Sequence, residues 1–184
     1  MGKIIVSHNV TLDGVGQDPT GEEGFDRGGW ANHLSDDDRA AWAKVEHEEA
    51  VAAAAMLLGG RSYDWFASRW VARTGEWADR LREMPKYVVS TTVTELPWPN
   101  TTVLSLDAVG ALRQQVDGDI VVYGSRRLAH ALFDLGLVDE VRLMVYPHVA
   151  GAGDRVLGAT ATRLRLVDAR TVGDNLAFLT YRTL

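Results

Sequence analysis

The sequence contains no cysteine, which excludes disulfide bonds, thiolate catalysis and cysteine-ligated metal. It also lacks an apolar run of about 18 residues, the length that a membrane-spanning helix requires. The apolar run near the N-terminus, within Met1 to His8, is too short for a signal peptide, so a cytoplasmic protein is expected. Acidic residues outnumber basic ones by 25 to 19, which gives a formal net charge of -6. This balance argues against a general nucleic-acid-binding protein, whose affinity would depend on a basic surface.

The composition is that of an ordinary globular domain. Hydrophobic residues make up 46% and charged residues 24% of the 184 residues, a length that suits one domain with a sizeable core. The sequence has no internal repeat, low-complexity tract or linker. We therefore expect a single domain over residues 1–184.

Predicted strands alternate with predicted helices along most of the chain. This order favours an α/β fold of three layers, in which a mixed, mostly parallel sheet carries helices on both faces. The last two strands have no helix between them, which predicts an antiparallel hairpin at the sheet edge. Strands are expected at 3–10, 56–58, 86–90, 101–104, 120–123, 141–146, 163–169 and 177–183. Helices are expected from Ser35 to about Ala50, at 63–70 and 76–83, from Asp107 to Val116, and at 126–135.

The segment from Thr11 to Leu34 is rich in glycine and aspartate and shows no periodicity, so it is predicted to be a long loop. Loops of this length inside a compact domain are often functional. Trp30 is unusual in a solvated loop, and it could line a flat heterocycle pocket or a dimer contact. Ser35 is a good N-cap for the next helix, and the acids that follow it at 36–38 suit the helix dipole.

Three predicted strands end in segments of similar chemistry, at Gly59–Ser62, Ser90–Thr92 and Gly124–Arg127. In open α/β sheets the ligand crevice lies beyond the carboxyl ends of the strands. The N–H groups at a helix start and the guanidinium groups of arginine both suit phosphate. Structural readings stay open for each segment: an ordinary turn for Gly124, a surface ion pair for Arg61, and capping hydroxyls at Ser90.

An ordered set of short motifs carries a resemblance to a known family. The motifs are Thr11-Leu12-Asp13-Gly14, Leu58-Gly59-Gly60-Arg61-Ser62-Tyr63, Gly124-Ser125 with Leu128, Gly136-Leu137-Val138-Asp139-Glu140, and the Pro147 to Gly153 loop. Together they resemble the dihydrofolate reductase-like superfamily. The branch that they resemble most is the reductase domain of the bifunctional riboflavin-biosynthesis deaminase–reductase, and the resemblance covers nearly the whole chain.

The resemblance implies an NADPH-dependent reductase of a small pteridine- or pyrimidine-like substrate, similar to 5-amino-6-(5-phosphoribosylamino)uracil reductase. It also implies a homodimer. The adenosine 2′-phosphate end of the cofactor would lie at the Arg61 turn and at Ser90 and Thr91, and the pyrophosphate at Gly124, Ser125 and Arg126. The loop after the first strand, with Asp13 and Trp30, would lie near the nicotinamide and the substrate. The cofactor-binding residues implied are Thr11, Gly60, Arg61, Ser62, Ser90, Thr91, Gly124, Ser125, Arg126 and Leu128.

The sequence departs from the family pattern at Ser125, which stands where the family has a second glycine and whose Cβ disfavours positive φ. Folate reductases use an acid near the start of the first helix, but Asp36, Asp37 and Asp38 are each explained as first-turn residues. The catalytic residue is therefore left unassigned. Two alternatives to the reductase stay open: a non-catalytic nucleotide-binding domain that retains the fold, and an unrelated α/β protein.

Overall fold

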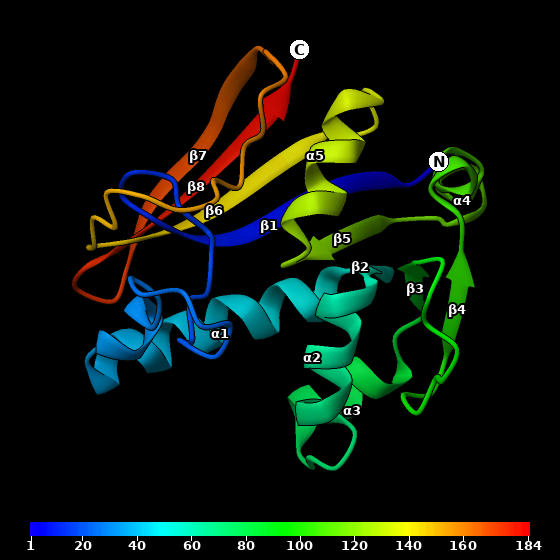
Figure 1. The fold of residues 1–184 in the computed structure, drawn as a ribbon, viewed down its shortest axis with the longest axis horizontal. Coiled ribbons are helices and arrows are strands. Elements are labelled where there is room, and N and C mark those ends of the chain that lie inside the picture. Colours follow the sequence, from blue (N-terminus) through cyan, green and yellow to red (C-terminus); the bar gives the residue numbers. More distant parts are fainter.

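A single eight-stranded sheet runs through the computed structural model, which describes residues 1–184 (Figure 1). Its strands are β1 (Lys3–Thr11), β2 (Ala55–Gly59), β3 (Lys86–Val89), β4 (Thr101–Leu104), β5 (Asp119–Tyr123), β6 (Glu140–Tyr146), β7 (Leu164–Val172) and β8 (Leu176–Thr183). Their order in the sheet is β4-β3-β2-β5-β1-β6-β8-β7. The first six are parallel to one another, whereas β8 is antiparallel to β6 and β7 is antiparallel to β8. The predicted mostly parallel sheet with a C-terminal antiparallel hairpin is therefore confirmed.

Helices cover both faces of the sheet, also as predicted. Buried residues of α4 and α5 join one core cluster, while those of α1, α2 and α3 pack on the opposite face. No helix is both long enough and apolar enough to cross a membrane. The α-helices are α1 (Asp36–Ala52), α2 (Gly60–Trp70), α3 (Glu76–Glu83), α4 (Val109–Gln115) and α5 (Arg126–Asp134), and the 3-10 helices are η1 (Trp30–His33) and η2 (Leu106–Ala108).

Several element boundaries differ from the sequence prediction. Helix α2 begins at Gly60, because the residues read from the sequence as a turn form its first helical turn. The helix predicted from Asp107 starts as the 3-10 helix η2 and becomes α-helical only at Val109. Strand β7 continues to Val172, and the predicted long loop contains the short helix η1.

The start of α1 is built as predicted, with one addition. The Ser35 Oγ accepts a hydrogen bond of 3.1 Å from the Asp38 N–H, which confirms the N-cap. The Asp38 carboxylate also accepts hydrogen bonds from the Asp174 N–H (2.7 Å) and the Asn175 side chain (2.9 Å). These bonds, the one from the Asn175 side chain first, lower the pKa of Asp38 to about 2. Asp38 therefore ties α1 to the β7–β8 turn.

A buried ion-pair network fixes α1 against the sheet. The Arg142 guanidinium on β6 donates to Glu49 on α1 at 2.9 Å and to Glu140 at 2.8 Å. The Glu49 and Glu140 side chains are only 5% and 9% exposed. Buried carboxylates of this kind are tolerated only while a cation compensates them. The position of α1 over β6 therefore depends on Arg142.

We predict that Arg142→Ala lowers the free energy of unfolding by about 3–5 kcal/mol, because it leaves two buried carboxylates unpaired. Urea titration followed by circular dichroism measures this loss. Lys44→Ala is the matched control, since the Lys44–Glu48 pair is exposed and its N–O distance is 4.0 Å. The control should change stability by less than about 0.5 kcal/mol. Equal effects of the two substitutions would show that the Arg142 network does not hold α1.

Candidate functional site

The three turns singled out in the sequence meet at one edge of the sheet. They follow β3, β2 and β5, which are neighbouring strands. The Gly59 N–H donates a hydrogen bond of 2.9 Å to the Ser125 Oγ, which joins the turn after β2 to the turn after β5. A Cβ at Gly60 would lie 3.0 Å from the Ser90 Oγ, and one at Gly124 would lie 3.4 Å from the Ser62 Oγ. The predicted cofactor-binding turns thus pack directly on one another.

Ser125 keeps the backbone conformation expected of the glycine that it replaces. Its φ is 59° and its ψ is 44°, in the left-handed region, and Gly124 before it has a φ of 55°. A residue with a Cβ adopts this conformation at a cost of about 1–2 kcal/mol. The hydrogen bond that the Ser125 hydroxyl accepts from Gly59 offsets part of this cost. The departure from the family pattern therefore supplies a contact that a glycine would lack.

The helices that begin at these turns have no side-chain cap. No side chain at Gly59, before α2, or at Ser125, before α5, accepts a hydrogen bond from the N–H groups of the first helical turn. Ser35, before α1, does accept such a bond. The first N–H groups of a helix have no partner within the helix, so an uncapped start is open to an anion. Two such starts lie side by side here, after the adjacent strands β2 and β5.

Some polar side chains near these helix starts form hydrogen bonds within the protein, and others are exposed and unpaired. The Ser90 Oγ accepts hydrogen bonds of 3.1 Å from the Thr92 and Val93 N–H groups, so it stabilises its own turn. Thr91 is exposed beside it. Arg61 is exposed as well, and its side chain makes no hydrogen bond or ion pair in the structure. Arg127, on the first turn of α5, is likewise exposed and makes no side-chain hydrogen bond or ion pair, so Arg61 and Arg127 are the cations at this edge that are free to contact a ligand.

The side chains of Arg126 and Leu128 point away from the edge of the sheet where the cofactor was predicted to bind. The Arg126 guanidinium turns toward the loop after β1 and donates to the Gly16 carbonyl oxygen at 2.9 Å. Carboxylate oxygens of Glu23 and Asp154 lie 3.4 Å and 3.8 Å from it. The Leu128 side chain is buried in the core. At both positions only the backbone N–H of the first turn of α5 is placed to meet a phosphate.

Thr11 and Asp13 build the loop that follows β1. The Thr11 Oγ1 donates to the Asp13 carboxylate at 2.6 Å, and that carboxylate also accepts from the Gly151 N–H at 2.8 Å and the Ala150 N–H at 3.1 Å. The hydrogen bond from Thr11, followed by the backbone donors, lowers the pKa of Asp13 to about 2. The Asp13 carboxylate is thus occupied in joining two loops, and the predicted substrate contact gains no support from its position.

Trp30, the other residue predicted to contact substrate, lies in a core cluster. It is 2% exposed, its ring meets that of Tyr146 edge-on at a centroid distance of 5.0 Å, and its N–H donates to the Gln17 carbonyl oxygen. The structure explains this tryptophan as the anchor of the long loop. A ring so enclosed offers no face to a heterocycle in this conformation.

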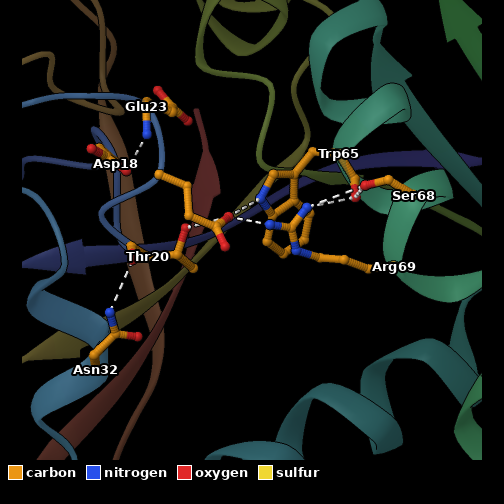
Figure 2. Close-up of polar contacts among 8 residues, drawn as sticks. Asp18, Thr20, Glu23, Asn32, Trp65, Ser68 and Arg69 are labelled. Atoms are coloured by element: carbon orange, nitrogen blue, oxygen red, sulfur yellow. Dashed lines mark hydrogen bonds and ion pairs between the residues drawn. The ribbon is translucent and has the colours of Figure 1, made fainter.

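The long loop crosses the edge of the sheet and contacts α2. The Asp18 carboxylate, fully buried, holds the loop together by accepting from the Glu23 and Phe25 N–H groups. Although burial opposes it, these donors lower the pKa of Asp18. The Glu22 carboxylate accepts from the Trp65 N–H at 3.1 Å and pairs with Arg69. Figure 2 shows Thr20 and Glu23 of the loop on one side of these contacts and Trp65, Ser68 and Arg69 of α2 on the other.

A half-buried acid on α1, Glu46, was missed by the sequence reasoning. Its helix contacts the end of β1, where the Trp42 N–H donates to the Asn9 Oδ1 at 3.1 Å. Burial and then the charge of Glu49 raise the pKa of Glu46 to about 8, so its carboxyl group is largely neutral at pH 7. The charge of Glu46 in turn helps raise the pKa values of Tyr123 and Tyr146, at the ends of β5 and β6. Glu46 is therefore close enough to both tyrosines to interact with them electrostatically.

Tyr123 completes this group. It is 7% exposed and directly precedes Gly124, and its buried hydroxyl has no partner at full hydrogen-bond geometry, although the Glu49 carboxylate is close enough to help raise its pKa. Buried polar groups without a partner are rare in proteins and commonly mark a site for water or a ligand. A sequence signal for this site does exist, since Trp42, Glu46 and Glu49 share the helix face of buried Ala50 and Ala53. An acid on an apolar helix face is the pattern that could have indicated Glu46.

The fold and these turns define an α/β protein with a mostly parallel sheet, and comparison with known proteins identifies its family. The model of the RibD C-terminal domain matches residues 2–178, so the chain belongs to this family. The uncharacterized protein YyaP of Bacillus subtilis is 27% identical over 192 residues, which cover 97% of this chain and 94% of YyaP.

Two solved structures show the same fold at low sequence identity. A pyrimidine reductase-like protein from Corynebacterium diphtheriae has a TM-score of 0.60 at 13% identity, with 100% of this chain and 92% of that chain covered. A diaminohydroxyphosphoribosylaminopyrimidine deaminase/5-amino-6-(5-phosphoribosylamino)uracil reductase from Thermotoga maritima has a TM-score of 0.63 at 16% identity. This chain is covered completely in that comparison but spans only 57% of the Thermotoga protein. The chain therefore has the fold of riboflavin-pathway reductases.

The contact between Ser125 and Gly59 yields a paired stability prediction. Ser125→Ala removes the hydrogen bond but keeps a Cβ at positive φ, so we expect a loss of about 1–2 kcal/mol in the free energy of unfolding. Ser125→Gly also removes the bond but relieves the backbone strain, so its stability should lie within about 1 kcal/mol of the wild type. Denaturant unfolding of the three proteins compares them. A glycine variant less stable than the alanine variant would contradict this account.

Proposed function

We propose that this protein is an NADPH-dependent reductase that transfers hydride to a small pyrimidine- or pteridine-like heterocycle. The observation that carries the proposal is the meeting of two uncapped helix starts and the unpaired Arg61 at the carboxyl edge of β3, β2 and β5. Membership of the RibD C-terminal domain family supports it, as does the fold shared with the Thermotoga maritima protein described as a deaminase and 5-amino-6-(5-phosphoribosylamino)uracil reductase.

The residues at this edge suit a dinucleotide phosphate. The pyrophosphate would bind the N–H groups at the start of α5, next to Gly124, where the left-handed backbone opens the turn. The 2′-phosphate would lie near Arg61 and Thr91, because a free guanidinium offers several fixed, charged donors. NADPH, when bound, supplies the hydride, while the protein binds and orients the reactants.

Glu46 and Tyr123 suit the proton transfer that such a reduction needs. Hydride addition to the carbon of a C=N bond leaves an electron pair on nitrogen, which must take up a proton. A carboxyl group that is still protonated at pH 7 is a competent donor, and efficiency is highest when its pKa lies near the working pH. Glu46 has this property, and it lies within electrostatic range of Tyr123, the residue that precedes Gly124. We propose Glu46 as the proton donor.

Cofactor titration tests the proposal directly. NADPH should bind more tightly than NADH, and Arg61→Ala should weaken NADPH binding about tenfold or more, because it removes a charged contact with the 2′-phosphate. NADH binding should change less than about threefold in the same variant. Fluorescence titration or calorimetry measures both.

The control for Arg61 is Arg163→Ala, which removes an equal charge from an exposed position before β7 whose side chain makes no hydrogen bond or ion pair. It should leave both affinities unchanged. No NADPH binding at millimolar-range concentration would reject the reductase proposal, and equal loss of both cofactors would reject only the role of Arg61. Binding without turnover of any pyrimidine or pteridine would favour a non-catalytic nucleotide-binding domain.

The pH dependence of Glu46→Gln tests the proton donor. Because the Glu46 pKa is raised to about 8 in the folded protein, its protonated form is lost as pH rises through 8. Wild-type turnover should therefore fall above pH 8, whereas the variant should be slower by about 10²-fold or more and lack this limb. Glu48→Gln, an exposed change on the same helix, should keep the wild-type profile.

The pH dependence of the free energy of unfolding of Glu46→Gln tests the raised pKa of Glu46 independently of its proposed role as proton donor. A carboxyl whose folded pKa is raised stabilises the fold below its unfolded pKa, and this contribution is lost as pH rises through the folded pKa. Wild-type stability should thus decline between about pH 5 and 8 by up to about 1.4 kcal/mol per pH unit. Glu46→Gln should flatten that decline. A flat wild-type curve would show that Glu46 ionises normally.

A further inference from the structure

A cavity of about 310 Å³ lies between α1 and the part of the sheet that β6, β8 and β7 form. All of its lining residues belong to these four elements. The cavity is therefore separate from the candidate phosphate site, which lies at the carboxyl ends of β3, β2 and β5. Its volume is that of about ten water molecules and falls at the lower end of the range for small-molecule sites. A small organic ligand would fit.

The walls of this cavity carry more negative than positive charge. Four lining side chains are carboxylates and two are guanidiniums, which leaves an excess of two negative charges. Such an excess near a partly enclosed space attracts cations and repels anions. The carboxylates are those of Glu48, Glu49, Glu140 and Asp168, and the guanidiniums are those of Arg142 and Arg170.

Two buried side chains in the lining keep oxygen atoms without a hydrogen-bond partner. Both contacts of the Arg142 guanidinium with Glu140, at 2.8 Å and 2.7 Å, are made to Oε1, so Oε2 is left unpaired. The Thr180 hydroxyl makes no hydrogen bond at all, although Thr180 is only 9% exposed. Buried polar atoms without a partner are rare and commonly mark a site for water or a ligand. Because a carboxylate oxygen can only accept, a ligand here must donate N–H or O–H groups.

The register of the sheet places further acceptors between these buried atoms and solvent. Thr180 stands opposite Arg142 on one side and opposite Asp168 on the other, so the three side chains form a row on the face that α1 covers. Asp168, at the outer end of the row, is exposed and pairs with no cation. Glu48 on α1 is also exposed, and the nearest cation is the Lys44 ammonium at 4.0 Å. The cavity thus has acceptors at its inner end and two carboxylates at its mouth.

The space between these two polar ends has apolar walls. Val45 of α1 and Phe178 of β8 line it. The Arg170 guanidinium lies over the Phe178 ring at 5.2 Å from its centroid, without a carboxylate partner, so this wall already accommodates a cation of the chain itself. A short methylene chain that carries a cation at each end would match both the walls and the ends.

We propose that this cavity binds a short alkyl diamine in its dicationic form. One ammonium group donates to the Thr180 hydroxyl and to Glu140 Oε2, and the other lies between Glu48 and Asp168 at the mouth. The two positive charges equal the excess of negative charge in the lining, and each ammonium offers three donors to the unpaired oxygens. The proposal concerns a second site and does not depend on the reductase function.

The test is calorimetric titration of the full chain with 1,4-diaminobutane, with n-butylamine and 1,4-butanediol as probes of similar size that carry one charge and none. The diamine should bind with a Kd below about 1 mM, and butylamine should bind about tenfold more weakly or worse. The diol should show no binding at concentrations up to about 10 mM. Because the contacts are ionic and partly exposed, added salt should weaken binding of the diamine more than that of butylamine.

Two substitutions locate the site. Thr180→Val removes the hydroxyl and keeps the shape of the side chain, and Asp168→Asn removes one charge at the mouth; each should weaken the diamine about fivefold or more. Asp174→Asn is the matched control, because Asp174 is exposed in the β7–β8 turn and its side chain makes no hydrogen bond or ion pair. It should change the affinity by less than about twofold.

Three results would overturn the proposal: no binding of the diamine to the wild type, similar binding of all three probes, or an unchanged affinity in either Thr180→Val or Asp168→Asn. Thermal unfolding checks that each variant is folded. If a variant fails to fold, the comparison of the three probes on the wild-type protein and the remaining variant decide the outcome.

Discussion

The hydrogen bond from the Gly59 N–H to the Ser125 Oγ joins the ends of two neighbouring parallel strands. Because β2 and β5 are adjacent, the helices that follow them must start side by side, and this bond sets how closely they approach. The same serine that makes the contact holds the left-handed turn before α5. The spacing of the two uncapped helix starts, and with it the shape of the candidate phosphate site, depends on this contact.

The fold could be predicted largely because its signals are local. Buried strand runs, the Ser35 cap and the glycine after α5 each lie within a few residues of the feature that they specify. The errors arose where tertiary packing extends an element beyond its own pattern. Helix α2 takes in Gly60 because that residue packs against Ser90, and β7 reaches Val172 because β8 supplies the ladder for it.

The site was predictable where it consists of backbone turns and less so where it consists of side chains. The order of β3, β2 and β5 brings the three turns together, but no local pattern shows where a long side chain points. The Arg126 guanidinium donates to the Gly16 carbonyl oxygen, and the Asp13 carboxylate accepts from the Gly151 N–H; both partners are distant in sequence. Glu46 became a candidate only through its surroundings, because its raised pKa arises from burial and from Glu49.

The Asp18 carboxylate gives the loop after β1 an internal order of its own. It accepts N–H groups from within the loop, and its own backbone carbonyl accepts the Gly21 and Gly29 N–H groups. The contacts from Glu22 to α2, by comparison, lie at the exposed surface. A segment built in this way can separate from α2 without losing its own hydrogen bonds. Opening the edge of the sheet to a substrate then requires the loop to release α2 and Arg126, and the conformational entropy of the loop is not lost again at each closure.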